Sequence, residues 1–153
     1  EEIPLGTGGA IKKAEPLIQS DNFLVMNGDC LWKDINFQDF YNFHISKDSF
    51  VSIMATQPAG EHDYGVILLN NSRRIKSFKE KNNDKNREYL ISMGIYLMRR
   101  DIFAYMPNSS FSLEYDFFPK ILKQKCYAFD TKARFIDIGT PGRYKSAANF
   151  FLR

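Results

Sequence analysis

The 153-residue sequence has no long hydrophobic run, no strong excess of one charge sign and only two cysteines. Because no apolar run reaches the ~18 residues that a membrane-crossing helix needs, we expect no membrane partner. The net charge is +3 and the basic residues are spread along the chain, which does not favour nucleic-acid binding. Cys30 and Cys126 lack CxxC spacing, so neither a disulfide framework nor a zinc site is supported.

The sequence opens at Glu1-Glu2-Ile3-Pro4, without an initiator methionine. It also does not show the pattern of a signal peptide. We therefore expect a cytoplasmic protein, and a fragment whose natural start has been removed. The length predicts one domain over residues 1–153, large enough to bury roughly 70% of its unfolded surface. The oligomeric state is left open, with a homo-oligomer as one option.

Two aspartates each end a hydrophobic, strand-like run in a tight turn that contains glycine. Asp29 follows 23–28, and Asp137 lies within 134–141. Ligands bind α/β sheets at the carboxyl ends of strands, and carboxylate oxygens suit a magnesium ion that carries phosphates. We predict that the fold brings the two aspartates together to bind Mg²⁺. The alternatives are that Asp29 only completes a turn and that Asp137 caps the following helix.

A glycine-rich segment, Leu5-Gly6-Thr7-Gly8-Gly9-Ala10, leads into a predicted helix. Glycines at a helix start let a base or phosphate approach the backbone N–H groups, so this segment is a candidate nucleotide site. An ordinary helix entry is the alternative.

Helical and strand-like patterns alternate along the chain. We expect a helix over 8–19 capped by Thr7, which Pro16 should kink or shorten, and a helix capped by Asn36 with Phe37, Phe40, Tyr41 and His44 on one face. We also expect a helix through Leu122 capped by Ser112, with Glu114 and Asp116 favouring its first turn, and a last helix over 141–152 capped by Thr140. We expect strands over 23–26, 51–56, 90–98, 125–130 and 134–138, and a hairpin of 64–69 with 75–79.

These patterns predict an α/β fold: a Rossmann-like three-layer sandwich with a mixed, mostly parallel sheet and one antiparallel excursion. Gly94 lies inside a predicted strand, which often marks a bulge or a close backbone approach. Neither His44 nor His62 is assigned to catalysis. Glu80-Lys81 and Tyr64-Gly65 are ambiguous as isolated pairs, since solvated charges and aromatic-glycine pairs are common.

Taken together, six segments resemble the sugar-1-phosphate nucleotidyltransferases, also called NDP-sugar pyrophosphorylases. The LGTGGA and FIDIGTP forms are most similar to the members that act on D-glycero-D-manno-heptose 1-phosphate with GTP. The matching segments occur in the family's order and cover almost the whole chain: 4–10, 25–29, 64–67, 78–81, 94–96 and 135–141.

The resemblance implies a nucleotidyl transfer from an NTP, with GTP favoured, to a sugar 1-phosphate of the heptose or mannose type. The products would be an NDP-sugar, used as a precursor of surface polysaccharide, and pyrophosphate. The implied roles are the nucleobase pocket for Gly6, Thr7 and Gly8, magnesium binding for Asp29 and Asp137, the sugar border for Tyr64 and Gly65, sugar hydroxyls for Glu80, the sugar phosphate for Lys81, and close approach to the sugar for Gly94. Asp29, Asp137 and Lys81 would be the catalytic residues.

The sequence also departs from the family. Family members begin with a strand and a G-G-x-G-T-R-L loop that holds the triphosphate, and this sequence contains neither, so we expect that about the first third of the family's domain is missing here. Ser92-Met93 replaces the usual small residues before Gly94. We therefore expect the isolated chain to be inactive and poorly stable. The alternative is a non-catalytic sugar-nucleotide sensor or regulatory subunit with the same fold.

Overall fold

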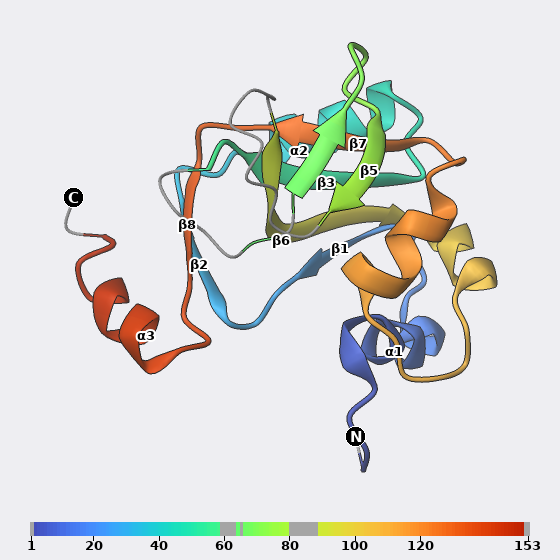
Figure 1. Ribbon diagram of the computed structural model, residues 1–153. Helices are drawn as coiled ribbons and strands as arrows, with labels where there is room; N and C mark the ends of the chain where they lie inside the picture. The colour runs from blue at the N-terminus through green and yellow to red at the C-terminus, as the bar shows by residue number, and fades with distance from the viewer. Residues whose placement is uncertain (1, 59–63, 65, 80–88, 152–153) are drawn as a thin grey trace.

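The computed structural model describes residues 2–58, 64, 66–79 and 89–151, and it places a mixed sheet between layers of helix (Figure 1). The strands are β1 (Asn22–Met26), β2 (Cys30–Lys33), β3 (Val51–Thr56), β4 (Val66–Leu69), β5 (Ile75–Lys79), β6 (Leu90–Arg99), β7 (Cys126–Asp130) and β8 (Arg134–Asp137). The helices are α1 (Gly6–Lys13), α2 (Phe37–Ser46), α3 (Pro141–Ala147) and four short 3₁₀ or π segments, η1 (Glu15–Leu17), η2 (Arg100–Tyr105), η3 (Leu113–Phe117) and η4 (Phe118–Ile121).

The long strand β6 organises the main sheet, whose order is β5-β4-β6-β3-β7. Along one edge β6 pairs first with β4 and then with β1, and it is antiparallel to both, as it is to β3 on its other edge. Strands β1, β3, β4 and β7 therefore all run opposite to β6. A separate antiparallel ribbon is formed by β2 and β8.

The α/β class and the mixed sheet are confirmed. The expectation that the sheet is mostly parallel does not hold for the pairings among the described strands, because β3–β7 is the one parallel pair. The physical reason is the insertion of β6, in the reversed direction, between strands that share an orientation. Its ladder with β3 also shifts register around Gly94, which is the bulge that a glycine inside a strand predicted.

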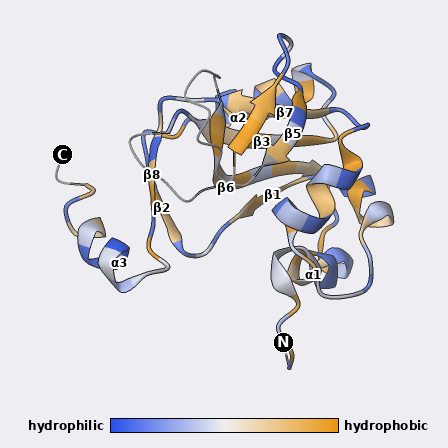
Figure 2. Cartoon of the chain, viewed as in Figure 1, coloured by the Kyte–Doolittle hydropathy of each residue, from blue (hydrophilic) through white to orange (hydrophobic). Residues whose placement is uncertain are grey.

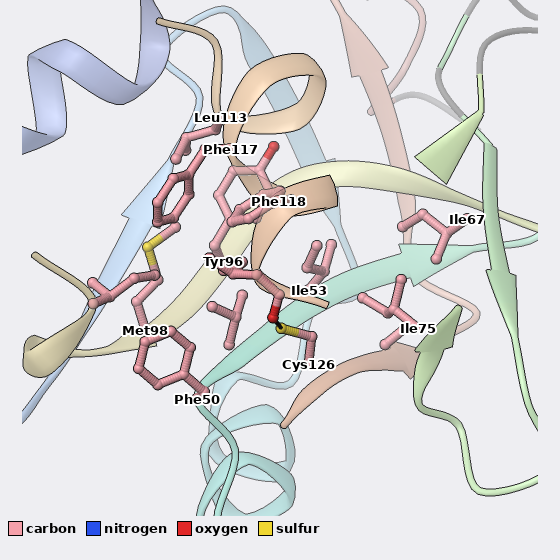
Figure 3. Close-up of a cluster of buried hydrophobic side chains, with 14 of the residues drawn as sticks. Phe50, Ile53, Ile67, Ile75, Tyr96, Met98, Leu113, Phe117, Phe118 and Cys126 are labelled. Atoms are coloured by element: carbon pink, nitrogen blue, oxygen red, sulfur yellow. Dashed lines mark hydrogen bonds between the residues drawn. The ribbon is translucent and has the colours of Figure 1, made fainter. Parts of the chain in front are cut away.

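Both faces of the sheet are buried, which gives the three layers that the sequence predicted. Along β3, Val51, Ile53 and Ala55 contribute to one core cluster and Met54 to the other, as the alternation of side chains in a strand requires. The larger cluster packs η2, η3 and η4 against the sheet, with Phe117 and Phe118 close to Tyr96 (Figure 3). Figure 2 shows the apolar residues concentrated on the strands and on the helical faces that meet them.

The helix α2 begins at the predicted cap, because the Asn36 side chain accepts a hydrogen bond from the Asp39 N–H at 3.1 Å. Its buried residues are Phe40 and His44, in the second core cluster and beside it. The expected single apolar face is only partly right, since Phe37 and Tyr41 are 43% and 45% exposed.

The first predicted helix is shorter than 8–19 and begins earlier. It ends at Lys13 and gives way to the short segment η1, which holds Pro16, so the predicted shortening is confirmed. The last helix is also shorter, ending at Ala147. In place of one helix over 112–122 there are a π turn and a 3₁₀ turn, which meet just before Pro119.

The sequence-based prediction missed β2 and η2. Only β8 pairs with β2 among the described strands, and it lies more than 100 residues later, so local patterning gave little signal. None of the helices within the described ranges has the length and apolar character needed to cross a membrane.

Candidate active site

The two predicted aspartates are held by the β2–β8 ribbon, which lies on the opposite side of the molecule from α1 in Figure 1. Asp29 immediately precedes β2, and Asp137 is the last residue of β8. The Asp29 carbonyl accepts a hydrogen bond from the Ile138 N–H at 2.8 Å, and Cys30 is the register partner of Asp137. Backbone pairing therefore brings together two residues that are far apart in the sequence.

Both carboxylates reach the same space beside Gly139. A methyl group at Gly139 would lie 3.1 Å from Asp137 Oδ1 and 3.4 Å from Asp29 Oδ2. The Gly139 N–H also donates to Asp137 Oδ1 at 2.6 Å. Asp137 does not cap α3, because the Thr140 side chain does so by accepting from the Arg143 N–H at 3.3 Å. The Asp137 carboxylate is therefore not the N-cap of the helix that follows.

Cys30 lies beside both carboxylates but is not a nucleophile. Its thiol is buried and lies 3.8 Å from Asp29 Oδ1. Burial first, and then the charges of Asp29 and Asp137, raise the pKa of Cys30 to about 12. The thiol thus stays protonated at neutral pH, as is typical of a small buried cysteine.

Tyr64 lines the site and contacts Arg143, which also binds Asp137. The Arg143 guanidinium donates to Asp137 Oδ2 at 3.1 Å and lies 5.4 Å from the centroid of the Tyr64 ring. That ring packs against Phe135 of β8, at a centroid distance of 5.1 Å. Burial is the main cause that raises the pKa of Tyr64, so its hydroxyl stays protonated at neutral pH.

A cleft of about 170 Å³ opens in front of the two aspartates. Of the other predicted site residues, Tyr64 and Gly94 line the cleft, whereas Gly6, Thr7 and Gly8 do not. The sequence-based prediction gave no site role to the remaining lining residues, which are Asn27, Cys30, Ser92, Met93, Glu114, Tyr115 and Phe135.

Gly94 is needed for the close contact between β6 and the Asn27 turn. Its φ is +69°, and a methyl group there would lie 2.6 Å from Asn27 Nδ2. The Asn27 N–H also donates to the Gly94 carbonyl at 2.9 Å. The close approach that Gly94 allows is therefore to the turn that carries Asp29.

Glu114 is the charged cleft residue that sequence reasoning missed. Its Oε1 accepts a hydrogen bond from the buried Tyr96 hydroxyl at 2.6 Å, and Ser112 caps the turn that carries it. Burial first, then the Glu114 carboxylate, raises the pKa of Tyr96 well above its usual value, so Tyr96 is a fixed donor. The only sequence signal at Glu114 is its position in the first turn of a predicted helix, which indicates a helix start and not a binding site.

The glycine segment packs against the chain that leads into η3. The Gly8 N–H donates to the Phe111 carbonyl at 2.9 Å, and the Thr7 hydroxyl accepts from the Leu113 N–H at 2.9 Å. A side chain at Gly6 or Gly8 would collide with Phe111. Thr7 therefore lies inside α1, joining it to η3, and does not cap the helix as the sequence predicted.

Three predicted site residues, Gly65, Glu80 and Lys81, lie outside the described residues. Among the described residues, no group of three or more histidine, cysteine and acidic side chains is arranged to hold a metal ion. Two carboxylates that meet at one point nevertheless fit a hard cation that takes its other ligands from water and phosphate, as Mg²⁺ does.

The chain is similar in sequence to known proteins. The family model described as "Nucleotidyl transferase" matches residues 1–153. The chain is 39% identical over 150 residues to a D-glycero-alpha-D-manno-heptose 1-phosphate guanylyltransferase of Aneurinibacillus thermoaerophilus, covering 96% of this chain and 63% of that protein. It is 30% identical over 161 residues to a mannose-1-phosphate guanyltransferase of Saccharomyces cerevisiae, covering 99% of this chain and 43% of the relative.

The fold is also found in solved structures. HddC from Yersinia pseudotuberculosis, solved in complex with GMP-PN, matches with a TM-score of 0.83 and 35% identity, over 99% of this chain and 64% of that one. The chain thus spans less than two thirds of the length of these relatives.

Proposed function

Because this chain belongs to the nucleotidyl transferase family, we propose that the protein transfers a nucleotidyl group from an NTP to a sugar 1-phosphate. GTP is the favoured nucleotide, and a heptose or mannose 1-phosphate the favoured acceptor, since the similar proteins are named for those reactions. The observation that carries the proposal is the meeting of Asp29 and Asp137 beside Gly139, in a cleft lined by Tyr64 and Gly94.

In the proposed reaction a phosphate oxygen of the sugar 1-phosphate attacks the α-phosphorus of the NTP in line. The new bond joins that oxygen to the α-phosphorus, and the bond to the bridging oxygen of pyrophosphate breaks. Asp29 and Asp137 would hold Mg²⁺, which when bound neutralises phosphate charge. The rest of the catalysis comes from positioning, because the protein has little covalent chemistry to perform.

The described residues supply that positioning through fixed contacts. The ribbon pairing at Cys30 and Asp137 holds the main chains of the two aspartates beside each other, and the Asn27 turn is held against β6 at Gly94. Glu114 would accept hydrogen bonds from sugar hydroxyls at the cleft, with its orientation set by the Tyr96 hydroxyl. This adds a residue to the roles proposed for Tyr64, Gly65, Glu80 and Gly94 at the sugar and for Lys81 at the sugar phosphate.

For the nucleobase, we propose the glycine segment Gly6-Thr7-Gly8. Its support is indirect: contacts with Phe111 and Leu113 fix the backbone of this segment in the structure. We also propose a magnesium cofactor, a cytoplasmic location and a role in the synthesis of surface-polysaccharide precursors.

The test is pyrophosphate release by the full-length protein. Each of the four NTPs is paired with heptose, mannose and glucose 1-phosphates, with Mg²⁺ and with a chelator. Metal-dependent release with one pairing identifies both substrates and supports the proposal. No release with any pairing, from a protein shown to be folded, would contradict it and favour the non-catalytic regulatory subunit.

A further inference from the structure

Arg143 is bound to the site without lining its cleft. Its guanidinium donates to Asp137 Oδ2 and lies over the Tyr64 ring, and its side chain is 31% exposed. A flat guanidinium placed between a carboxylate and an aromatic face is restrained by both, since it forms a charged hydrogen bond to one and stacks on the other. The position of Arg143 in the first turn of α3 follows from the Thr140 cap.

The two oxygens of Asp137 have different surroundings. Oδ1 accepts from the Gly139 N–H and is the oxygen that lies toward the space shared with Asp29. Oδ2 is held by Arg143. The guanidinium therefore fixes the orientation of Asp137 from one side and leaves Oδ1 facing Asp29.

Arg143 also changes the charge of the site. Two carboxylates that meet at one point attract a divalent cation strongly, and a guanidinium bonded to one of them offsets part of that attraction. At this distance, one unit of positive charge lowers the affinity of the two carboxylates for a divalent cation by about 5-fold to 10-fold. Without Arg143 the Asp137 side chain would also regain some rotational freedom, which has a smaller effect on the affinity for the cation.

We propose that Arg143 is a positioning residue that keeps the affinity of the Asp29–Asp137 pair for a free divalent cation low. The cation then enters the site bound to the phosphates of the nucleotide, whose negative charge restores the attraction. This inference rests on the proposed function, because it concerns the metal that the nucleotidyl transfer would use.

The test measures Mn²⁺ alone, by calorimetric titration of the 153-residue chain and of the full-length protein. The variants are Arg143→Gln, which removes the charge, and Arg143→Lys, which keeps it. Arg134→Gln is the matched control, because it removes the same charge from the start of β8, where Arg134 pairs with Asp34 at 3.8 Å. A thermal melt of each variant establishes that it is folded.

We expect Arg143→Gln to bind Mn²⁺ about 5-fold to 10-fold more tightly than the wild type, with Arg143→Lys and Arg134→Gln close to the wild type. The gain should vanish when Asp137→Asn is added to Arg143→Gln. Unchanged or weaker binding by Arg143→Gln, or no saturable binding by any variant, would overturn the inference. Because Mn²⁺ binding needs no turnover, the result is distinguishable from a failure of the pyrophosphate assay.

Discussion

Asp29 and Asp137 are joined through the main chain of a two-stranded ribbon, and their carboxylates converge on Gly139. The Asp29 carbonyl is bonded to the Ile138 N–H, and Cys30 is paired with Asp137. The main-chain positions of the two aspartates are therefore fixed by backbone hydrogen bonds. That rigidity suits a site whose main task is to align two substrates.

Replacement of either aspartate should abolish most of the activity of the full-length protein. We expect Asp29→Asn and Asp137→Asn each to lower the rate of pyrophosphate release by about 100-fold or more, since each removes a charged ligand from the proposed Mg²⁺ site. Asp34→Asn is the matched control: Asp34 is exposed and pairs with Arg134, and asparagine tolerates its φ of +64°. Near-normal rates in both site variants would refute the metal assignment.

A methyl group at Gly139 should block the space between the carboxylates. We expect Gly139→Ala to weaken Mn²⁺ binding and to lower turnover about 10-fold or more, because the added carbon would lie 3.1 Å and 3.4 Å from the two carboxylate oxygens. The control is Gly142→Ala, where an added carbon meets nothing within 4 Å. Equal metal binding and equal turnover in the two variants would show that the space beside Gly139 is not used.

Replacement of Gly94 should destabilise the chain. We expect Gly94→Ala to lower the free energy of unfolding by about 1–3 kcal/mol, because φ is +69° there and the Asn27 side chain lies in the way. Urea denaturation followed by circular dichroism measures the loss. Adding Asn27→Gly should recover part of it, since that change removes the colliding side chain but not the unfavourable φ. No loss in the single variant would contradict the geometry of the bulge.

Acid should weaken the fold through His44. Its ring is buried, with Nδ1 2.9 Å from Ser52 Oγ and Nε2 3.1 Å from Asn22 Oδ1. Burial first, and then the charge of Arg99, lowers the pKa of His44 to about 4, against a small opposing effect of Asp48. The unfolded chain therefore binds a proton near pH 6.5 that the folded chain does not bind until about pH 4.

The free energy of unfolding should consequently fall as the pH drops from about 6.5 toward 4, by up to about 3 kcal/mol from this group, and no further below that. The measurement is urea denaturation at pH 7, 6, 5 and 4.5 for the wild type and His44→Gln. Other titrating groups are common to both proteins, so the difference in slope isolates His44. Identical slopes would show that the ring is not held neutral in the fold.

Much of the fold and of the site can be predicted from local patterns. The runs at 51–56 and 90–98 are almost continuously apolar, as strands buried on both faces are, and the caps Asn36, Ser112 and Thr140 each accept the expected backbone hydrogen bond. Asp29, Asp137 and Gly94 were recognisable because a carboxylate or a glycine interrupts an apolar run. Those signals depend only on residues close together in the chain.

Other features could not be read from the sequence, because their partners are distant. The strand β2 owes its conformation to β8, and the direction of β6 between β1 and β3 makes most of the described pairings antiparallel. The cleft positions of Glu114 and Tyr115 depend on how η3 packs against β6, and local patterning gives no measure of that packing.

The sequence by itself determined the apolar strands, the helix caps and the two carboxylates at strand ends, since these follow from side-chain period, hydrogen-bonding capacity and charge. Only the tertiary structure decided that the carboxylates meet, that Arg143 rather than a helix N-terminus holds Asp137, and that Gly6, Thr7 and Gly8 pack against Phe111 and Leu113. The physical reason is that local patterns do not decide which side chains meet: the contacts of Asp29 with Asp137 and of Thr7 with Leu113 join residues more than 100 apart, and Arg143 reaches Asp137 only because α3 packs beside β8.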